Sequence, residues 1–249
     1  MIEVEEKIEH KTGNSPSRVK VWKLFDRISQ RYDLLNRLLS FYRDVRWRKE
    51  VVNHLNDTGG QIVLDLATGT ADLLITLCSG SDKVTKGFGI DPAEKMMEIG
   101  RRKIQKKNLD NYSFLFPGNA EDIPFRANTF DAVTIAFGIR NLTDVDRGLR
   151  EMFRILKPGG RSIILEFSLP ENRIIRSFYL FYFRNILPRI GAVISGDKYA
   201  YNYLNRTVET FPYGDAFSSL MNKAGFSDLK SVALTLGVAT IYTGVKPVN

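Results

Sequence analysis

The sequence predicts an α/β fold with a mostly parallel β-sheet and helices on both faces. From residue 61 onward, short runs rich in β-branched residues alternate with longer stretches that have helical periodicity. A chain of 249 residues with 43% hydrophobic residues is also long enough to bury such a sheet. Alternation of this kind is typical of strand–helix–strand units packed as a layered domain.

The first part of the chain, residues 1–58, is expected to form a helical extension. Its apolar residues recur every three or four positions, which places on one helical face Trp22, Phe25, Ile28, Tyr32, Leu35 and Leu39. That face either packs on the core or acts as a lid over a lipophilic site, and the pattern leaves both open. A turn-forming cluster from Asp57 to Gly60 marks the start of the α/β domain, residues 59–249.

The first five strands expected in this domain are short β-branched runs bounded by turn residues: Gln61–Leu66, Gly87–Ile90, Tyr112–Phe116, Phe130–Phe137 and Arg161–Phe167. The helices expected between them are Thr70–Cys78, Ala93–Lys106 and Asp144–Leu156. This order of elements predicts parallel strands, because each helix carries the chain back across the sheet.

The pattern changes after Pro170. Two helical stretches rich in aromatic residues form an expected insertion at about residues 170–214. A helix at Asp215–Ala224 and two strands, Ser227–Leu236 and Val238–Val245, complete the domain. The last two strands lie too close for a helical crossover, so we expect them to pair antiparallel. The sheet then has seven strands, with an antiparallel last strand.

The composition excludes several classes of protein. The single cysteine, Cys78, rules out an internal disulfide, and two histidines leave too few soft ligands for a structural zinc site. We therefore expect no metal site and a reducing, cytoplasmic setting. The first fourteen residues are polar, which argues against a secretion signal. Arginines interrupt the longest apolar region, residues 173–194, whereas a bilayer-spanning helix needs about 20 mainly apolar residues.

The net charge of +8 is concentrated near the N-terminus. Residues 15–50 hold ten Lys or Arg and four Asp or Glu, so they contribute +6 of that charge. A basic region of this kind attracts nucleic acid, anionic lipid or an acidic ligand, and charge alone leaves all three open.

Two acidic residues stand at the ends of the first two expected strands, where a doubly wound sheet binds its ligands. Asp65 is placed to hold the following turn or a charged ligand, and Gly69 in that turn lets backbone approach a ligand closely. Asp91 is placed to accept hydrogen bonds from the ribose hydroxyls of an adenosine ligand. A dinucleotide fingerprint needs glycine at positions 67, 69 and 72, and only Gly69 is present, which argues against a nicotinamide cofactor.

Several motifs together resemble the class I methyltransferases, which have a Rossmann-like fold. They are Val63–Asp72, Asp91, the loop Asn119–Phe125 and the turn Leu156–Gly160. More narrowly, the chain is similar to the C-methyltransferases of ubiquinone and menaquinone biosynthesis. The likeness covers roughly residues 20–246, and the motifs that carry it are Tyr32–Asn36, Phe137–Asn141 and Arg154–Ser168.

This resemblance implies transfer of a methyl group from S-adenosylmethionine (SAM) to a ring carbon of a prenylated quinol, such as demethylmenaquinol. It implies cofactor contacts at Thr70, Asp91, Asn119 and Ala120. A further cofactor position, usually a serine in the family, is Ala136 here, so only backbone contact remains possible. In the turn after Ser40 the chain has Tyr42 where the family commonly has glycine.

The chemistry of methyl transfer suggests two further candidates. SAM carries an activated methyl group, so the protein must align donor and acceptor, expel water and remove a quinol proton. We predict that Arg140 stabilises the developing phenolate; the alternative is an ion pair with Asp144 or Asp146. Tyr201, in the insertion, is a candidate to orient or deprotonate the acceptor; the alternative is a packing role.

The aromatic run at residues 178–183 is expected to form a wall for the isoprenoid tail. Arg176 and Arg184 flank it, so the run is placed to rest on the anionic inner face of a membrane. The alternative is a subunit interface in a homo-oligomer.

Two rival functions stay open at this point. One is a class I methyltransferase that acts on another small molecule or on RNA, which the basic N-terminal region allows. No RNA-binding module is recognisable, so we expect no nucleic-acid partner. The other is a nonenzymatic cofactor-binding protein that takes part in assembly.

Overall fold

The computed structural model describes residues 21–40, 42–80, 82–186, 189 and 198–248. Its centre is one sheet of seven strands in the order β3-β2-β1-β4-β5-β7-β6. The strands are β1 (Gln61–Leu66), β2 (Val84–Asp91), β3 (Ser113–Pro117), β4 (Phe130–Ala136), β5 (Leu156–Phe167), β6 (Ser227–Leu234) and β7 (Ala239–Val245). Strands β1 to β5 pair parallel, and β7 runs antiparallel to both β5 and β6. The predicted α/β fold with an antiparallel last strand is confirmed.

The helices fall close to their predicted places. They are α1 (Trp22–Leu39), α2 (Arg43–Asn53), α3 (Asp72–Ser79), α4 (Glu94–Lys106), α5 (Val145–Ile155), α6 (Arg173–Phe181), α8 (Lys198–Thr210) and α9 (Asp215–Lys223). A π-helical turn, η2 (Tyr182–Ile186), extends α6, and short 3-10 turns are η1 (Ile139–Asn141) and η3 (Thr235–Gly237). The described residues between Pro170 and Gly214 therefore form mainly helices, as the sequence predicts for the insertion.

Strand β5 begins earlier than predicted, because its first residues form hydrogen bonds with distant parts of the chain. Leu156 pairs with Phe130 of β4, five residues before the predicted start. The N–H of Gly159 donates to the carbonyl of Lys246, 2.8 Å away, and Gly159 takes a φ of 77°. A sequence pattern records the turn residues Pro158 and Gly159 but carries no signal for these distant partners.

Helices cover both faces of the sheet, and two apolar clusters fill the space between. On one face α2 and α3 bury Trp47, Val51, Leu73 and Leu77 against β1, β4, β5 and β7. On the other face α5 and α9 bury a second set, Leu149, Met152, Phe217 and Met221. Helix α2 therefore packs on the sheet itself. The predicted boundary between an N-terminal extension, residues 1–58, and the α/β domain, residues 59–249, stays a prediction.

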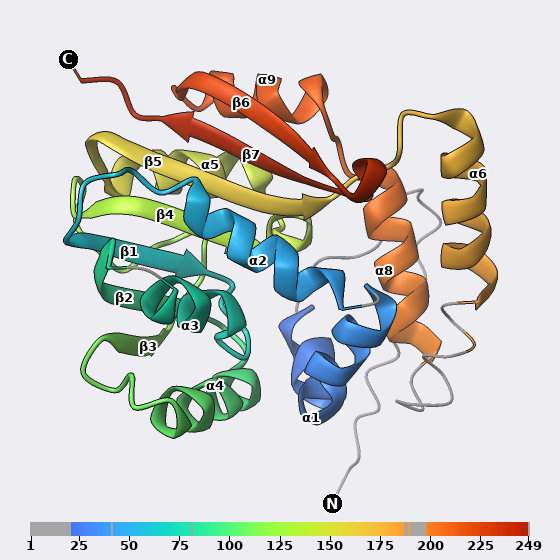
Figure 1. Cartoon of the computed structure of the whole chain (residues 1–249), viewed down its shortest axis with the longest axis horizontal. Coiled ribbons are helices and arrows are strands. Elements are labelled where there is room, and N and C mark those ends of the chain that lie inside the picture. Colours follow the sequence, from blue (N-terminus) through green and yellow to red (C-terminus); the bar gives the residue numbers. More distant parts are fainter. Residues whose placement is uncertain (1–20, 41, 81, 187–188, 190–197, 249) are drawn as a thin grey trace, which may run out of the picture.

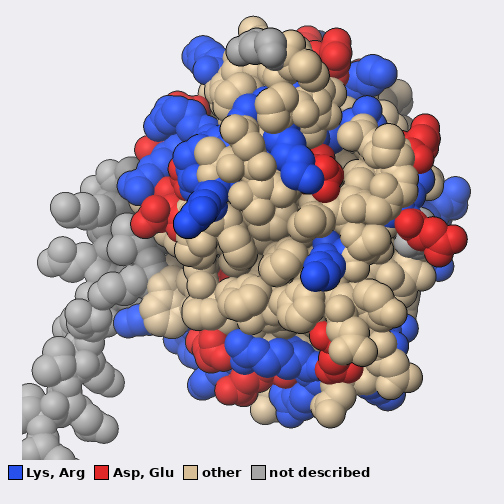
Figure 2. All heavy atoms as spheres, turned by 90° about the vertical axis from the view of Figure 1, so that its left-hand side faces the viewer, with Lys and Arg blue, Asp and Glu red and all other residues tan. Residues whose placement is uncertain are grey.

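The carboxyl ends of β1 and β4 lie at the point where the strand order reverses, and α1, α6 and α8 lie at this edge of the sheet (Figure 1). Ligands of doubly wound sheets bind at such a reversal, because neighbouring crossovers leave in opposite directions and open a crevice. The side of the molecule away from α6 carries interspersed Lys, Arg, Asp and Glu (Figure 2). No helix in the described part of the chain is long and apolar enough to cross a membrane.

Candidate active site

Asp65 holds the turn that follows β1. Its side chain is 1% exposed and accepts hydrogen bonds from the hydroxyls of Thr68 and Thr134, each at 2.7 Å. Burial raises the pKa of Asp65 from 3.8 to about 7, although both hydroxyl bonds act in the opposite direction. The carboxyl thereby ties the β1 turn to the neighbouring strand β4.

Asp91, at the end of β2, joins two turns. One carboxylate oxygen accepts the N–H of Gly69 at 2.9 Å, and the other accepts the N–H of Ala93 at 2.7 Å. Burial raises the pKa of this carboxyl from 3.8 to about 6. An ionised carboxylate offers about four acceptor sites, so both oxygens can still take a ligand hydroxyl.

Strained backbone gathers around these carboxylates. Three residues without the freedom of glycine take positive φ angles: Ala67 at 47°, Ala71 at 62° and Phe137 at 56°. Gly138 brings the β4 turn so close to the β1 turn that a Cβ there would lie 2.7 Å from the Cβ of Ala67. Such strain persists where surrounding contacts fix the backbone, and it concentrates at functional sites.

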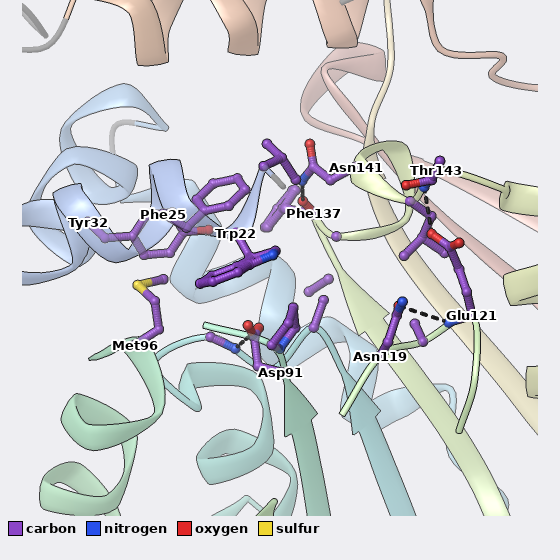
Figure 3. Close-up of a pocket in the computed structure, with 18 residues that line it drawn as sticks. Trp22, Phe25, Tyr32, Asp91, Met96, Asn119, Glu121, Phe137, Asn141 and Thr143 are labelled. Atoms are coloured by element: carbon purple, nitrogen blue, oxygen red, sulfur yellow. Dashed lines mark hydrogen bonds between the residues drawn. The ribbon is translucent and has the colours of Figure 1, made fainter. Parts of the chain in front are cut away.

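A cavity of about 260 Å³ opens above these strand ends; we call it the strand-end cavity (Figure 3). Trp22, Phe25 and Tyr32 of α1 line one side of it, and Asp91 and Asn119 reach it from the strand ends. Its other lining residues are Val21, Ala67, Gly69, Pro92, Met96, Ala120, Glu121, Ala136, Phe137, Gly138, Asn141, Leu142 and Thr143. A recess of about 30 Å³ shares Gly69 and Ala136 with it.

Helix α1 is fastened over this cavity by polar contacts. The hydroxyl of Thr70 donates to Asp33 at 2.6 Å. Lys103 of α4 forms ion pairs with Asp33 and, at 2.6 Å, with Asp72, and donates to the Thr70 hydroxyl at 2.9 Å. The aspartate of the Tyr32–Asn36 motif therefore ties the N-terminal helix to the turn that follows β1.

A second cavity, of about 480 Å³, has mainly apolar walls; we call it the aromatic cavity. Its lining residues are Asn36, Ser40, Arg43, Asp44, Trp47, Phe137, Phe167, Tyr179, Tyr182, Phe183, Leu204, Thr235 and Val238. Phe137 lines both cavities, and its ring packs against Phe167 with centroids 4.6 Å apart. The two cavities therefore meet at the strained end of β4.

Arg140 lies in a buried ion pair. Its Nη1 donates to Glu166 at 2.6 Å and to the carbonyl of Phe137 at 2.6 Å, and Glu166 is fully buried. Its Cζ is 5.3 Å from the centroid of the Phe167 ring, which lines the aromatic cavity. The alternative partner Asp144 caps α5 instead, accepting the N–H of Arg147 at 2.9 Å.

The structure brings most of the predicted cofactor residues together. Those that line the strand-end cavity are Gly69, Asp91, Asn119, Ala120 and Ala136. Asp65 and Thr70 line the adjoining recess. Tyr201 lies on α8, and its side chain is outside the described residues. The roles of all these residues stay predictions.

Sequence reasoning assigned no role to four polar residues that shape the site. Asp33 and Glu166 stand inside the quoted motifs, so their position beside assigned residues was the available signal. No signal in the sequence points to Thr134 or Lys103. Thr134 meets Asp65 only through sheet pairing, and Lys103 meets Thr70 only through helix packing.

Comparison with known proteins identifies the family. The model of the ubiE/COQ5 methyltransferase family matches residues 12–246. The chain belongs to the ubiE/COQ5 methyltransferase family. One relative in Geotalea daltonii, named ubiquinone/menaquinone biosynthesis C-methyltransferase UbiE, is 42% identical over 91% of this chain and 96% of its own length. Another in Thermus thermophilus, named demethylmenaquinone methyltransferase, is 44% identical over 90% of this chain and 100% of its own length.

Solved structures agree on the fold of this ubiE/COQ5 methyltransferase. A SAM-dependent methyltransferase of Thermotoga maritima, a possible histamine N-methyltransferase, aligns over 91% of this chain and 99% of its own with a TM-score of 0.64. The two sequences are 22% identical, so the likeness concerns the fold alone. The chain is therefore a methyltransferase with the fold of class I SAM-dependent enzymes, and SAM is the expected cofactor.

Proposed function

We propose that this protein transfers the methyl group of SAM to a ring carbon of a prenylated quinol. The substrate that we propose is demethylmenaquinol. The family and the names of its relatives support this reaction class. The observation that carries the proposal is the pair of cavities that meet at Phe137. Methyl transfer needs donor and acceptor held in line, and two adjoining cavities offer a place for each.

The residues of the strand-end cavity fit SAM. The Asp91 carboxylate suits the ribose hydroxyls, and the Asn119–Ala120 backbone and amide suit an adenine edge. Gly69, with a φ of 55°, presents backbone close to the recess that Asp65 and Thr70 line, which suits the amino-acid end. When bound, SAM supplies an electrophilic methyl group on a sulfonium.

The aromatic cavity suits the acceptor. Its walls of Trp47, Phe167 and Phe183 favour a flat ring and an apolar tail by burying apolar surface. We propose that Arg140 stabilises the phenolate form of the quinol: it lines neither cavity, but its guanidinium lies 5.3 Å from the ring of Phe167, which lines the aromatic cavity. Substituting Arg140 with Met should lower turnover and spare cofactor binding. An unchanged rate would remove Arg140 from the mechanism.

The proposed reaction is tested with methyl-labelled SAM and reduced quinol analogues. Incubation with a demethylmenaquinol analogue and with a ubiquinol precursor analogue, followed by extraction into organic solvent, should place label in the quinone fraction. The preferred acceptor identifies the substrate. Label in RNA or in another small molecule would point to a different methyltransferase. Cofactor binding without any transfer would favour a nonenzymatic assembly protein.

We propose further that α6 rests on an anionic membrane surface on the cytoplasmic side. Its outer side chains are apolar and exposed: Ile174 at 68%, Phe178 at 73% and Phe181 at 61%. Arg173 and Arg176 on the same helix suit anionic lipid headgroups. Tyr179 of α6 lines the aromatic cavity, so the helix links a lipid surface to the proposed quinol site.

Vesicle flotation tests this contact. The protein should float with vesicles that contain anionic lipid, and Phe178→Asp should abolish flotation. Tyr112→Asp is the matched control, because Tyr112 is a 51% exposed aromatic residue beside β3, on the opposite side of the molecule (Figure 1). Absence of flotation together with a dimer that Phe178→Asp dissociates would assign the face to a subunit interface instead.

A further inference from the structure

The aromatic cavity contains a buried acid whose position suggests a task in the proposed reaction. Among the described residues that line it, Asp44 is the one with a carboxylate. Asp44 is 2% exposed and lies in the first turn of α2, beside Ser40, which is 8% exposed. A buried carboxylate on an otherwise apolar wall needs partners, because an uncompensated charge there is costly.

Both oxygens of Asp44 are fixed. The hydroxyl of Ser40 donates to Oδ1 at 2.6 Å, and the backbone N–H of Asp44 donates to the Ser40 Oγ at 3.2 Å. Arg48 Nη1 pairs with Oδ2 at 2.5 Å. Ser40 lines the cavity, and its Oγ keeps one lone pair for a ligand, since a hydroxyl has two and the Asp44 N–H takes the other.

Arg48 places this pair next to the point where the cavities meet. Its Cζ lies 5.8 Å from the centroid of the Phe137 ring, and Phe137 lines both cavities. A proton acceptor is useful at that point, because the ring carbon that takes the methyl group must face the donor there.

The same cavity also has a polar group without a partner. The Tyr179 hydroxyl is buried and has no hydrogen-bond partner among the described residues. Burial raises the Tyr179 pKa, so this group stays protonated and donates rather than accepts a proton. A ligand oxygen in the cavity would give this buried hydroxyl the partner it lacks.

We propose that Ser40 and Asp44 form the proton-accepting pair that ionises the quinol, with the Tyr179 hydroxyl donating to the second quinol oxygen. This inference rests on the proposed function and assigns the step that its chemistry requires. A quinol carries two ring oxygens, and the cavity offers one acceptor pair and one donor from different elements, α2 with the preceding turn and α6.

The quinol hydroxyl gives its proton to Ser40 Oγ as the Ser40 proton passes to Asp44. The neighbouring ring carbon forms a bond to the methyl group while the methyl–sulfur bond breaks and leaves its electron pair on sulfur. The ring carbon then releases its hydrogen as a proton to water, and the oxygen regains a proton from Asp44 through Ser40. One proton is released for each methyl group transferred.

The charged and titratable groups around the pair come from several elements. Arg43 and Arg48 belong to α2, Asp72 of α3 lies 3.8 Å from Arg48, and Tyr179 and Tyr182 face the cavity from α6 and η2. Of these, Asp44 and Asp72 are the carboxylates. Asp72 is paired with Lys103 at 2.6 Å and does not line the aromatic cavity, which leaves Asp44 as the carboxylate placed to receive the proton.

Single-turnover methyl transfer to a reduced demethylmenaquinol analogue, with SAM saturating, tests the proposal. Asp44→Asn should lower the rate about 100-fold near neutral pH, the usual scale of a lost general base. The residual rate should then rise nearly tenfold per pH unit, because alkali ionises a phenolic hydroxyl, whose pKa is about 10, without the enzyme. Asp44→Glu should restore part of the rate and the flatter profile.

Ser40→Ala provides a second test that keeps the Asp44–Arg48 pair and should lower the rate at least about tenfold. Ser219→Ala, a helix serine on α9 bonded to the carbonyl of Asp215, is the matched control. Ser40→Ala and Asp44→Asn should both keep the affinity of wild type for S-adenosylhomocysteine. Asp44→Asn should lower the melting temperature, because it takes a carboxylate from the buried Arg48; if this variant does not fold, Ser40→Ala decides. Rates within about threefold of wild type with an unchanged pH profile would overturn the proposal. Wild-type protein that methylates no quinol would overturn the proposed function instead.

Discussion

At the scale of single residues, burial decides how the acidic side chains behave. Asp65 and Asp91 both carry a raised pKa, yet each is held by short hydrogen bonds. Desolvation outweighs those bonds because neither carboxylate has a cation within ion-pair distance among the described residues. Asp44, by contrast, has Arg48 beside it. Asp65 and Asp91 are thus held by hydrogen bonds from neutral groups, whereas Asp44 is held by a cation as well.

Asp65 should make the protein less stable as pH rises. Its folded pKa of about 7 lies above the ordinary 3.8, so its contribution is complete below about pH 4 and is lost as pH rises through 7. The free energy of unfolding should fall by roughly 2–4 kcal/mol between about pH 4 and about pH 7 from this group. Urea titrations of wild type and Asp65→Asn measure it, and the variant should show a shallower decline, with Asp91 supplying the rest. Parallel pH curves would contradict this account.

At the scale of elements, the N-terminal helices owe their position to two local features. Asp33 ties α1 to Thr70 and Lys103, across the strand-end cavity from the sheet. Tyr42 is the last residue before α2, and its backbone has a left-handed conformation with a φ of 60°. The departure from the family pattern noted in the sequence thus falls on a residue whose backbone conformation favours glycine.

Replacing Tyr42 should reveal that backbone strain. Tyr42 is 57% exposed, so its side chain contributes little burial. Tyr42→Gly should be about 1 kcal/mol more stable than Tyr42→Ala, because alanine keeps the left-handed penalty and glycine does not. Chemical unfolding of the two variants measures the difference. Equal stabilities would mean that another contact fixes this turn.

Loss of the Asp33 tie should loosen α1. Asp33→Ala removes the acceptor of the Thr70 hydroxyl and one partner of Lys103. We expect affinity for S-adenosylhomocysteine to fall about tenfold, the scale of one charge-assisted hydrogen bond, and amide exchange in residues 22–39 to quicken. Arg101→Ala on α4, which removes an exposed pair with Glu94, is the control. Unchanged exchange in α1 would show that its apolar contacts hold it alone.

At the scale of the whole molecule, one ligand site joins parts of the chain that are distant in sequence. The strand-end cavity takes residues from α1, from the turns after β1 and β2, and from the loops after β3 and β4. A ligand bound there contacts each of these parts in the folded state and none of them together in the unfolded chain, so binding stabilises the fold as a unit.

Cofactor binding should therefore raise the melting temperature. S-adenosylhomocysteine at about 100 times its Kd adds about 2.7 kcal/mol, or roughly 5–10 °C for a domain of this size. Differential scanning calorimetry measures the shift. Asp91→Ala should remove most of it at the same ligand concentration, because the acceptor for the ribose hydroxyls is lost. A full shift in the variant would place the ligand elsewhere.

The sequence by itself determined the order and type of the elements. Hydrophobic periodicity is a local property, so strands such as Gln61–Leu66 and helices such as Asp215–Lys223 were predictable to within a few residues. Placement of Gly69, Asp91, Asn119 and Ala120 near one crevice followed from a general rule of parallel sheets, because their strands end at the same edge.

Only the tertiary structure decided which polar groups meet. Arg140 pairs with Glu166 rather than with Asp144, and Thr134 reaches Asp65 across 69 positions of sequence, because β4 lies beside both β1 and β5. The aromatic cavity likewise arises where α2, α6 and β4 converge. Such contacts depend on the register of strands and the packing of helices, which periodicity within one segment does not record.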